Sequence, residues 1–135
     1  MIGLDSNVLV RYLTRDDEQQ FRAAERAILS AVEAGEAIHV CIPVLMETVW
    51  LLRSTYGVDR RRIAEILQAL LDIRAFALEN EPTVEAALDA FQSSSADFAD
   101  CLIGLTNVGV GCRSTLTFDA RAAKAPAFEL LTGAG

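Results

Sequence analysis

The chain has a single histidine, His39, and a single lysine, Lys124, among its 135 residues. One histidine excludes a ribonuclease mechanism in which two histidines act as acid and base. A serine–histidine–aspartate triad would have to use His39, and the G-x-S-x-G turn that carries such a serine is missing from the sequence. His39 stands between Ile38 and Val40 in a strand-like segment, so its simplest role is that of a residue packed in a sheet.

The sequence also has few cysteines and no long apolar run. Its three cysteines, Cys41, Cys101 and Cys112, lack the spacing of a zinc site. Each lies in an apolar segment, which predicts buried, reduced thiols and a reducing compartment. The longest run without a charged residue extends from Cys101 to Cys112, well short of the roughly 20 residues that span a bilayer. Asp5 interrupts the apolar start, so no signal peptide is expected and the predicted location is the cytoplasm.

Basic residues are scarce: 12 lysines and arginines stand against 19 acids, for a formal net charge of −7. This balance argues against a protein that holds nucleic acid by a broad basic surface, since such binding depends on many contacts between Lys or Arg and phosphates. It does not exclude a nuclease that works through bound cations. The glycine-rich loops that bind nucleotides, G-x-x-x-x-G-K-[ST] and G-x-G-x-x-G, are missing as well.

What the chain does have is the composition of an ordinary globular domain, with 52% hydrophobic and 23% charged residues. We expect a single domain over residues 1–132 and a loose tail over 133–135. Apolar periodicity and turn residues predict strands at 1–4, 37–42, 76–78, 113–118 and 128–131. They predict helices at 21–31, 43–57, 59–70, 82–91, 97–108 and 121–124. Strands that alternate with helices predict an α/β fold, with a parallel sheet covered by helices on both faces.

Two acidic residues stand directly after predicted strands. Asp5 follows the first strand, and Asp119 follows the strand that ends at Phe118. Ligands of open α/β sheets bind outside the carboxyl ends of the strands, so both acids are placed for a site. Each could instead be the N-cap of a following helix, a position where aspartate is favoured, and for either residue taken alone that alternative is at least as good.

Three further acids lie in apolar helices. Glu47 is the one charged residue between positions 41 and 52, and a buried carboxylate needs a metal, a hydrogen-bond network or an arginine such as Arg53. Asp97 and Asp100 share one face of the first turn of a helix, where they could form a start that resembles a capping box. The alternative of a simple cap is strong for Asp97 and weaker for Asp100, which precedes an uncharged run.

The five acids together indicate a metal site. Carboxylates that converge at one edge of a sheet repel one another, which raises their pKa values. A divalent cation removes this conflict, and hard cations such as Mg²⁺ or Mn²⁺ prefer oxygen ligands. Such an ion lowers the pKa of a bound water and stabilises charge on a phosphodiester, so hydrolysis of a nucleic acid is the chemistry we expect.

Four segments, in order along the chain, resemble the motifs of PIN domains. They are residues 4–9 (LDSNVL), 43–47 (PVLME), 97–103 (DFADCLI) and 117–119 (TFD). The resemblance covers nearly the whole chain, and the short length is similar to that of the VapC toxins of bacterial toxin–antitoxin pairs. It implies a three-layer α/β/α fold with a short parallel sheet whose strand order is like 3-2-1-4-5.

The resemblance also implies roles for individual residues. Four acids would be catalytic and would hold Mg²⁺, or Mn²⁺ as a substitute: Asp5, Glu47, Asp100 and Asp119. Glu47 would bind directly or through water, and Asp97 would be an accessory metal ligand. Three polar residues match positions that orient the acids: Ser6, which stands where threonine is commoner, Asn7 and Thr117. Four basic residues near the acids are candidates for contacts with RNA phosphates: Arg11, Arg15, Arg121 and Lys124.

Our main hypothesis is a metal-dependent endoribonuclease toxin of the VapC type, in which a metal-activated water attacks structured RNA such as tRNA or ribosomal RNA. The resemblance implies a homodimer and a cognate antitoxin, which blocks the acidic pocket and supplies the only link to DNA; no membrane partner is expected. Three alternatives remain open: a housekeeping PIN nuclease of RNA processing, a non-catalytic interaction domain, and a non-nuclease acidic metal-binding α/β domain. A phosphotransfer receiver, one form of the latter, needs a lysine near its aspartate, and Lys124 fits that position poorly.

Overall fold

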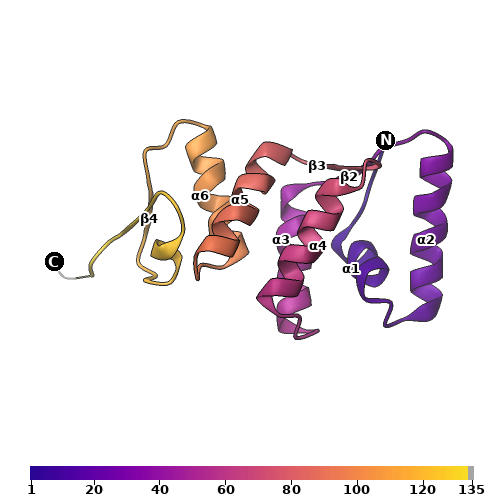
Figure 1. Cartoon of the computed structure of the whole chain (residues 1–135), viewed down its shortest axis with the longest axis horizontal. Helices are drawn as coiled ribbons and strands as arrows, with labels where there is room; N and C mark the ends of the chain where they lie inside the picture. The colour runs from indigo at the N-terminus through magenta and orange to yellow at the C-terminus, as the bar shows by residue number, and fades with distance from the viewer. Residues whose placement is uncertain (134–135) are drawn as a thin grey trace. The chain divides into compact units, whose positions relative to one another are not determined.

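The computed structural model describes residues 1–133, which form two compact units, one from Met1 to Glu79 and one that begins at Asn80 (Figure 1). The first unit contains β1 (Ile2–Gly3), α1 (Ser6–Thr14), α2 (Glu18–Glu33), β2 (Ile38–Val40), α3 (Ile42–Ser54), α4 (Arg60–Asp72) and β3 (Phe76–Leu78). The second contains α5 (Glu81–Ser93), α6 (Phe98–Gly109), β4 (Thr115–Thr117), the short 3-10 helix η1 (Ala122–Lys124) and β5 (Phe128–Leu130). Apart from Gly133, the expected tail lies outside the described residues.

All strands in the described part of the chain pair in parallel. The sheet of the first unit has the order β1-β2-β3, with Ile38 opposite both Ile2 and Phe76, and the sheet of the second unit pairs β4 with β5. The neighbours 3-2-1 and 4-5 of the expected order therefore occur. Short parallel strands joined by helices confirm the predicted α/β fold class.

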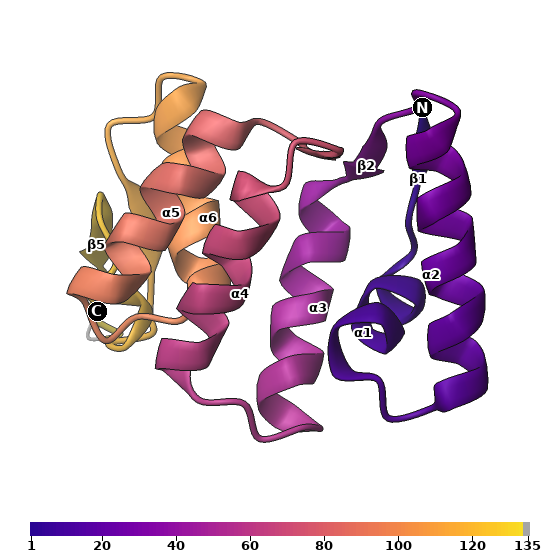
Figure 2. The same ribbon diagram turned by 45° about the vertical axis from the view of Figure 1, so that its right-hand side comes forward.

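The first unit is held together by apolar stripes at helical spacing. In α2, the buried residues are Phe21, Ala24, Ile28 and Ala31, and in α4 they include Ile63, Leu67 and Leu70. Helix α1 packs against α2 and α3, and α3 packs against α4, which lies beside it in Figure 2. Each fully buried Leu or Ile stabilises the fold by roughly 1.5–3 kcal/mol relative to an exposed one. The strand β2 buries Ile38 and Val40, with His39 half-buried between them, as the sequence predicts.

Helix α1 is an element that the sequence pattern does not predict. Its run Val8-Leu9-Val10 is rich in β-branched residues, which locally favour a strand. Leu9 and Val10 are nevertheless buried, so packing against the neighbouring helices decides the conformation. The helix ends at Arg15, which adopts the left-handed conformation with φ 54°. Asp17 then caps α2 by accepting the Gln20 amide at 3.0 Å.

The helix that carries Glu47 is capped by a side chain that lies directly after strand β3. Helix α3 begins at Ile42, one residue before Pro43, and its own N-cap residue Cys41 makes no side-chain capping bond. Instead, the carboxylate of Glu79, directly after β3, accepts the Ile42 amide at 2.9 Å. A negative charge at this end also interacts favourably with the helix dipole.

The second unit packs two helices through aromatic residues. Phe91 of α5 and Phe98 of α6 meet edge to face, with ring centroids 5.9 Å apart. Further along α6, a Cβ on Gly104 would lie 2.7 Å from a ring carbon of Phe128 and 2.8 Å from the carbonyl oxygen of Pro126. Glycine at this position therefore allows α6 to approach the segment that leads into β5.

Within the described residues, none of the three cysteines forms a disulfide, and not all of them are buried as expected. Cys101 is buried in α6 and Cys41 is half-buried, whereas Cys112 is exposed. The prediction is wrong for Cys112 because this residue follows the end of α6 and lies in the turn after Gly111, outside the packed part of the helix. Within residues 1–133, no helix combines the length and the apolar character needed to cross a membrane.

Candidate functional site

A first acidic cluster joins Asp5 and Glu47 through one hydroxyl group. Asp5 follows β1 and is the N-cap of α1, where its Oδ1 accepts the Ser6 amide at 2.7 Å. The Ser6 hydroxyl lies 3.3 Å from the same Oδ1 and also donates to Oε1 of Glu47 on α3. Ser6 is only 4% exposed, so its position is set by packing. The hydroxyl of a single buried serine is thus within hydrogen-bonding distance of two carboxylates that come from distant segments.

Glu47 itself is exposed, which contradicts the expectation of a buried carboxylate. Helix α3 buries Leu45, Val49 and Leu52 on one face, and Glu47 lies outside that face. The sequence is misleading here because α3 also carries apolar residues on its solvent side. The alternative of an ion pair with Arg53 is not realised: within residues 1–133, Nη1 of Arg53 is buried without a hydrogen-bond partner.

A second acidic cluster consists of Asp97, Asp100 and Asp119. The first two lie at the start of α6, and Asp119 follows β4. Burial raises the pKa of the Asp100 carboxyl above its ordinary value, and the negative charges of Asp97 and Asp119 raise it further, while the positive charge of Arg121 opposes the shift. The three carboxylates therefore repel one another, which is the conflict that a bound cation relieves.

Arg121 and Thr117 organise this second cluster. Asp97 occupies the N-cap position of α6 but makes no capping bond, so the alternative of a simple cap is wrong for it. Its carboxylate lies 3.4 Å from Nη2 of Arg121 instead. The backbone N–H of Arg121 donates to Oδ1 of Asp119 at 2.8 Å, and the N–H of Asp119 donates to the Thr117 hydroxyl at 3.0 Å. These contacts fix the turn that carries Asp119.

Comparisons with known proteins follow the same segments. The model of the PIN domain family matches residues 2–127. The chain belongs to the PIN domain family. A VapC ribonuclease from Aquifex aeolicus (strain VF5) is 26% identical to this PIN domain over 118 residues, which cover 87% of each protein. The resemblance of the four ordered motifs to PIN domains is therefore confirmed over nearly the whole chain.

The donor atoms of this PIN domain suit a hard divalent cation. All five candidate ligands are carboxylates, the groups that Mg²⁺ and Mn²⁺ prefer. Within residues 1–133, however, no three Asp, Glu, His or Cys side chains are already arranged to hold an ion. The structure brings Asp5 together with Glu47, and Asp97 together with Asp100 and Asp119. That all five serve one metal site remains a prediction from the sequence.

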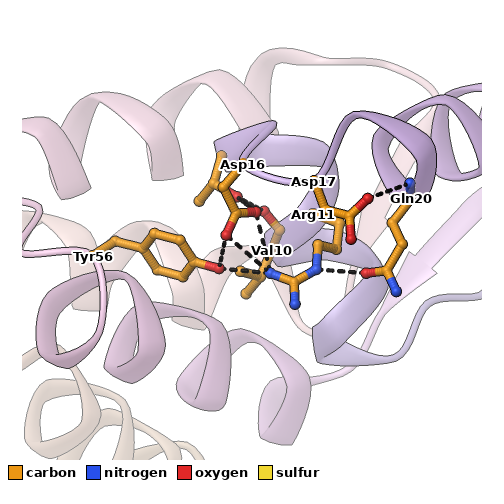
Figure 3. Close-up of polar contacts among 7 residues, drawn as sticks. Val10, Arg11, Asp16, Asp17, Gln20 and Tyr56 are labelled. Atoms are coloured by element: carbon orange, nitrogen blue, oxygen red, sulfur yellow. Dashed lines mark hydrogen bonds and ion pairs between the residues drawn. The ribbon is translucent and has the colours of Figure 1, made fainter.

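Arg11, a candidate for RNA contact, is the centre of a polar network in the first unit (Figure 3). Its Nη1 donates to the Tyr56 hydroxyl at 2.7 Å and to Asp16 at 3.1 Å, and its Nε donates to Gln20 at 2.6 Å. The Tyr56 hydroxyl in turn donates to Asp16 at 2.8 Å. This hydrogen bond is the largest cause of a lowered pKa of Asp16, whose charge raises the pKa of Arg11.

Arg15 is engaged in a similar way. It donates to Glu18 at 2.9 and 3.0 Å, and its guanidinium lies 4.3 Å from the centre of the Phe21 ring. With the pairing of Arg121, three of the four basic candidates have carboxylate partners within the chain. Contacts of these arginines with RNA phosphates would require an exchange of partners, and they remain predictions.

Within residues 1–133, the Asn7 side chain makes no hydrogen bond to the acids that it is expected to orient. It is exposed, and it lines a groove of about 460 Å³ between α1 and α2. Val8 and Arg11 line the same groove from α1, and alanines of α2 form much of the other wall. An orienting role for Asn7 therefore remains a prediction from the resemblance.

Several contacts near these clusters escape the sequence patterns. Glu79 could have been found, because it follows β3 just as Asp5 follows β1. Tyr56 and Asp16 have no such signal, since they lie 40 residues apart in the chain and meet only in the folded unit. The ion pair of Arg121 with Asp97 likewise joins segments that no local pattern connects.

Proposed function

We propose that this PIN domain is a divalent-metal-dependent endoribonuclease and the toxin of a VapBC-type toxin–antitoxin pair. The observation that carries the proposal is the presence of two carboxylate clusters, Asp5 with Glu47 and Asp97 with Asp100 and Asp119, in a member of the PIN family. The similarity to a VapC ribonuclease supports the choice of RNA and of a toxin role.

The proposed catalytic acids are Asp5, Glu47, Asp100 and Asp119, with Asp97 as an accessory ligand. Mg²⁺, or Mn²⁺ as a substitute, would supply a water of lowered pKa and stabilise charge on the phosphodiester. The raised pKa of Asp100 supports a ligand role, because repulsion among carboxylates is relieved when a cation binds. Ser6 orients the carboxylates of Asp5 and Glu47, which are exposed and able to accept a proton from an attacking water.

The proposed substrate is structured RNA, such as tRNA or ribosomal RNA, in the cytoplasm. We further propose a homodimer and a cognate antitoxin whose tail covers the acids, with DNA contacted only through the antitoxin. The net charge of −7 supports a partner that brings basic residues to these clusters. These assignments rest on family membership and on the similarity to a VapC ribonuclease.

Expression of the wild type and of Asp5→Ala, each without antitoxin, tests the proposal in a bacterial host. We expect the wild type alone to stop growth, and sequencing of RNA 5′ ends to show new cleavage sites after its induction. The purified wild type should cut cellular RNA with Mn²⁺ and stop when EDTA is added. If both proteins are harmless and the purified protein cuts no RNA, the proposal fails.

Further measurements separate the alternatives. Asp89→Asn removes one exposed negative charge from α5 and is the matched control, which should behave as the wild type. Cleavage by the purified protein without harm to the host would favour a housekeeping nuclease. Equally weak binding of Mn²⁺ by the wild type and by Asp100→Ala in calorimetry would favour a non-catalytic interaction domain.

A further inference from the structure

An exposed indole stands next to the first acidic cluster. Trp50 is the single tryptophan of the chain, and it is 65% exposed on α3. It follows Glu47 by three residues, which places both side chains on the same face of the helix, with Cβ atoms roughly 5–6 Å apart. The adjacent Val49 is buried, so α3 is anchored to the core while Trp50 projects from its other side. A flat aromatic surface is therefore held within one helical turn of a candidate catalytic carboxylate.

The charge of the chain makes such a surface useful for binding RNA. Binding by phosphate contacts requires free cations, and Arg11, Arg15 and Arg121 are paired with carboxylates of the chain itself. Stacking of a base on an aromatic ring needs no positive charge and changes affinity by roughly 5- to 150-fold per base. Unpaired nucleotides of RNA are recognised in this way, with the base splayed out onto an aromatic side chain.

We propose that Trp50 stacks on an unpaired base of the RNA, next to the phosphodiester that the acids cleave. This inference rests on the proposed function and adds the requirement that the target nucleotide is unpaired, as in a loop of a structured RNA. Glu47 argues against a second protein copy on the same face. Its exposed carboxylate would lose water in an apolar interface, and an unpaired buried carboxylate is strongly unfavourable. An RNA that reaches this face through a bound cation avoids that cost.

The single tryptophan allows a direct binding measurement. Asp119→Asn, which lies in the other unit, provides a background in which cleavage is blocked and Trp50 is unchanged. We expect short oligoadenylate to quench the tryptophan emission of this protein, and an abasic oligonucleotide of the same length to leave it nearly unchanged. Equal quenching by both, or no quenching by either, would overturn the inference.

Kinetics supply a second readout. Trp50→Ala should raise KM for oligoadenylate roughly 5- to 150-fold with little change in kcat, whereas Trp50→Phe, which keeps an aromatic face, should restore most of the affinity. On the abasic substrate, the wild type and Trp50→Ala should have the same KM. Leu29→Ala, which removes an exposed apolar side chain from a different helix, α2, is the matched control and should leave both KM values unchanged. Equal KM values for the wild type and Trp50→Ala on both substrates would overturn the inference.

The outcomes separate this inference from the proposed function. If the wild type and Trp50→Ala cut RNA equally well, the proposed nuclease activity stands and the stacking of Trp50 on a base is refuted. A wild type that cuts no RNA refutes the nuclease, and the quenching experiment then still decides whether Trp50 contacts bases. If Trp50→Ala turns a dimer into a monomer in sedimentation, this face of α3 is an interface between copies and the inference is wrong.

Discussion

Asp5 is expected to stabilise the fold through the oxygen that caps α1 and to support RNA cleavage through its negative charge. Two substitutions distinguish these two roles. Asp5→Asn removes the negative charge but keeps an oxygen that can accept the Ser6 amide, which lies 2.7 Å from Oδ1. Asp5→Ala removes both the charge and the acceptor. Asparagine is about as good an N-cap as aspartate, whereas alanine at an N-cap costs about 0.5–2 kcal/mol.

The expected magnitudes follow from this geometry. The capping bond reaches the first amide of α1 rather than the second or third, so we take about 1 kcal/mol for Asp5→Ala. In a domain of this length, that loss lowers the melting temperature by about 4 °C, and Asp5→Asn should lose about 1 °C or less. Both variants should lose at least about 100-fold in RNA cleavage, because residues that merely orient metal ligands already contribute about 10- to 100-fold.

Circular dichroism melts in EDTA measure the stability, and Mn²⁺-dependent cleavage of a defined RNA measures the activity. Asp89→Asn, with one exposed charge removed from α5, should match the wild type in both assays. If Asp5→Asn retains more than about a tenth of the activity, the carboxylate is not a metal ligand. If Asp5→Asn melts as low as Asp5→Ala, the capping argument is wrong.

Three further substitutions test the clusters and the packing. Ser6→Ala should lower cleavage about 10- to 100-fold and stability by about 1 kcal/mol; unchanged kinetics would show that its hydroxyl is not needed. In EDTA, Asp100→Asn should melt above the wild type at neutral pH, because folding raises the pKa of Asp100 and so disfavours its charged form. This gain in melting temperature should disappear as the pH falls through the raised pKa of Asp100 in the folded state to its ordinary value of 3.8. A gain that is the same at every pH would contradict the raised pKa of Asp100. Gly104→Val should cost about 1–3 kcal/mol in chemical denaturation, because its Cβ would lie 2.7 Å from the Phe128 ring; wild-type stability would refute the close contact.

Most helices and strands of the chain were predictable because their signals are local. The stripe Phe21, Ala24, Ile28 and Ala31 repeats at helical spacing, and Gly35, with φ 75°, ends the segment as expected. Helix α1 was not predictable in this way. The β-branched residues around Leu9 favour a strand, and the burial of Leu9 against neighbouring helices overrides that preference.

The candidate acids were predictable as positions, but their surroundings were not. Asp5 and Asp119 follow strands in the structure, as their sequence context indicates. Glu47 was expected to be buried because its helix is apolar on most faces, yet it lies on the solvent side of α3. A pattern of apolar residues gives the period of a helix, and it does not say which face remains without a neighbour.

The sequence by itself determined the order of the elements other than α1, the positions of the candidate acids and membership of the PIN family. These features depend on local spacing and on short motifs, which a linear chain carries in full. Only the tertiary structure decided that Ser6 bridges Asp5 and Glu47, that Arg121 pairs with Asp97 and that Tyr56 joins Arg11 to Asp16. The contacts of Ser6 with Glu47, of Arg121 with Asp97 and of Tyr56 with Arg11 and Asp16 join distant segments of the chain, so they exist only after the apolar faces have packed and brought these segments together.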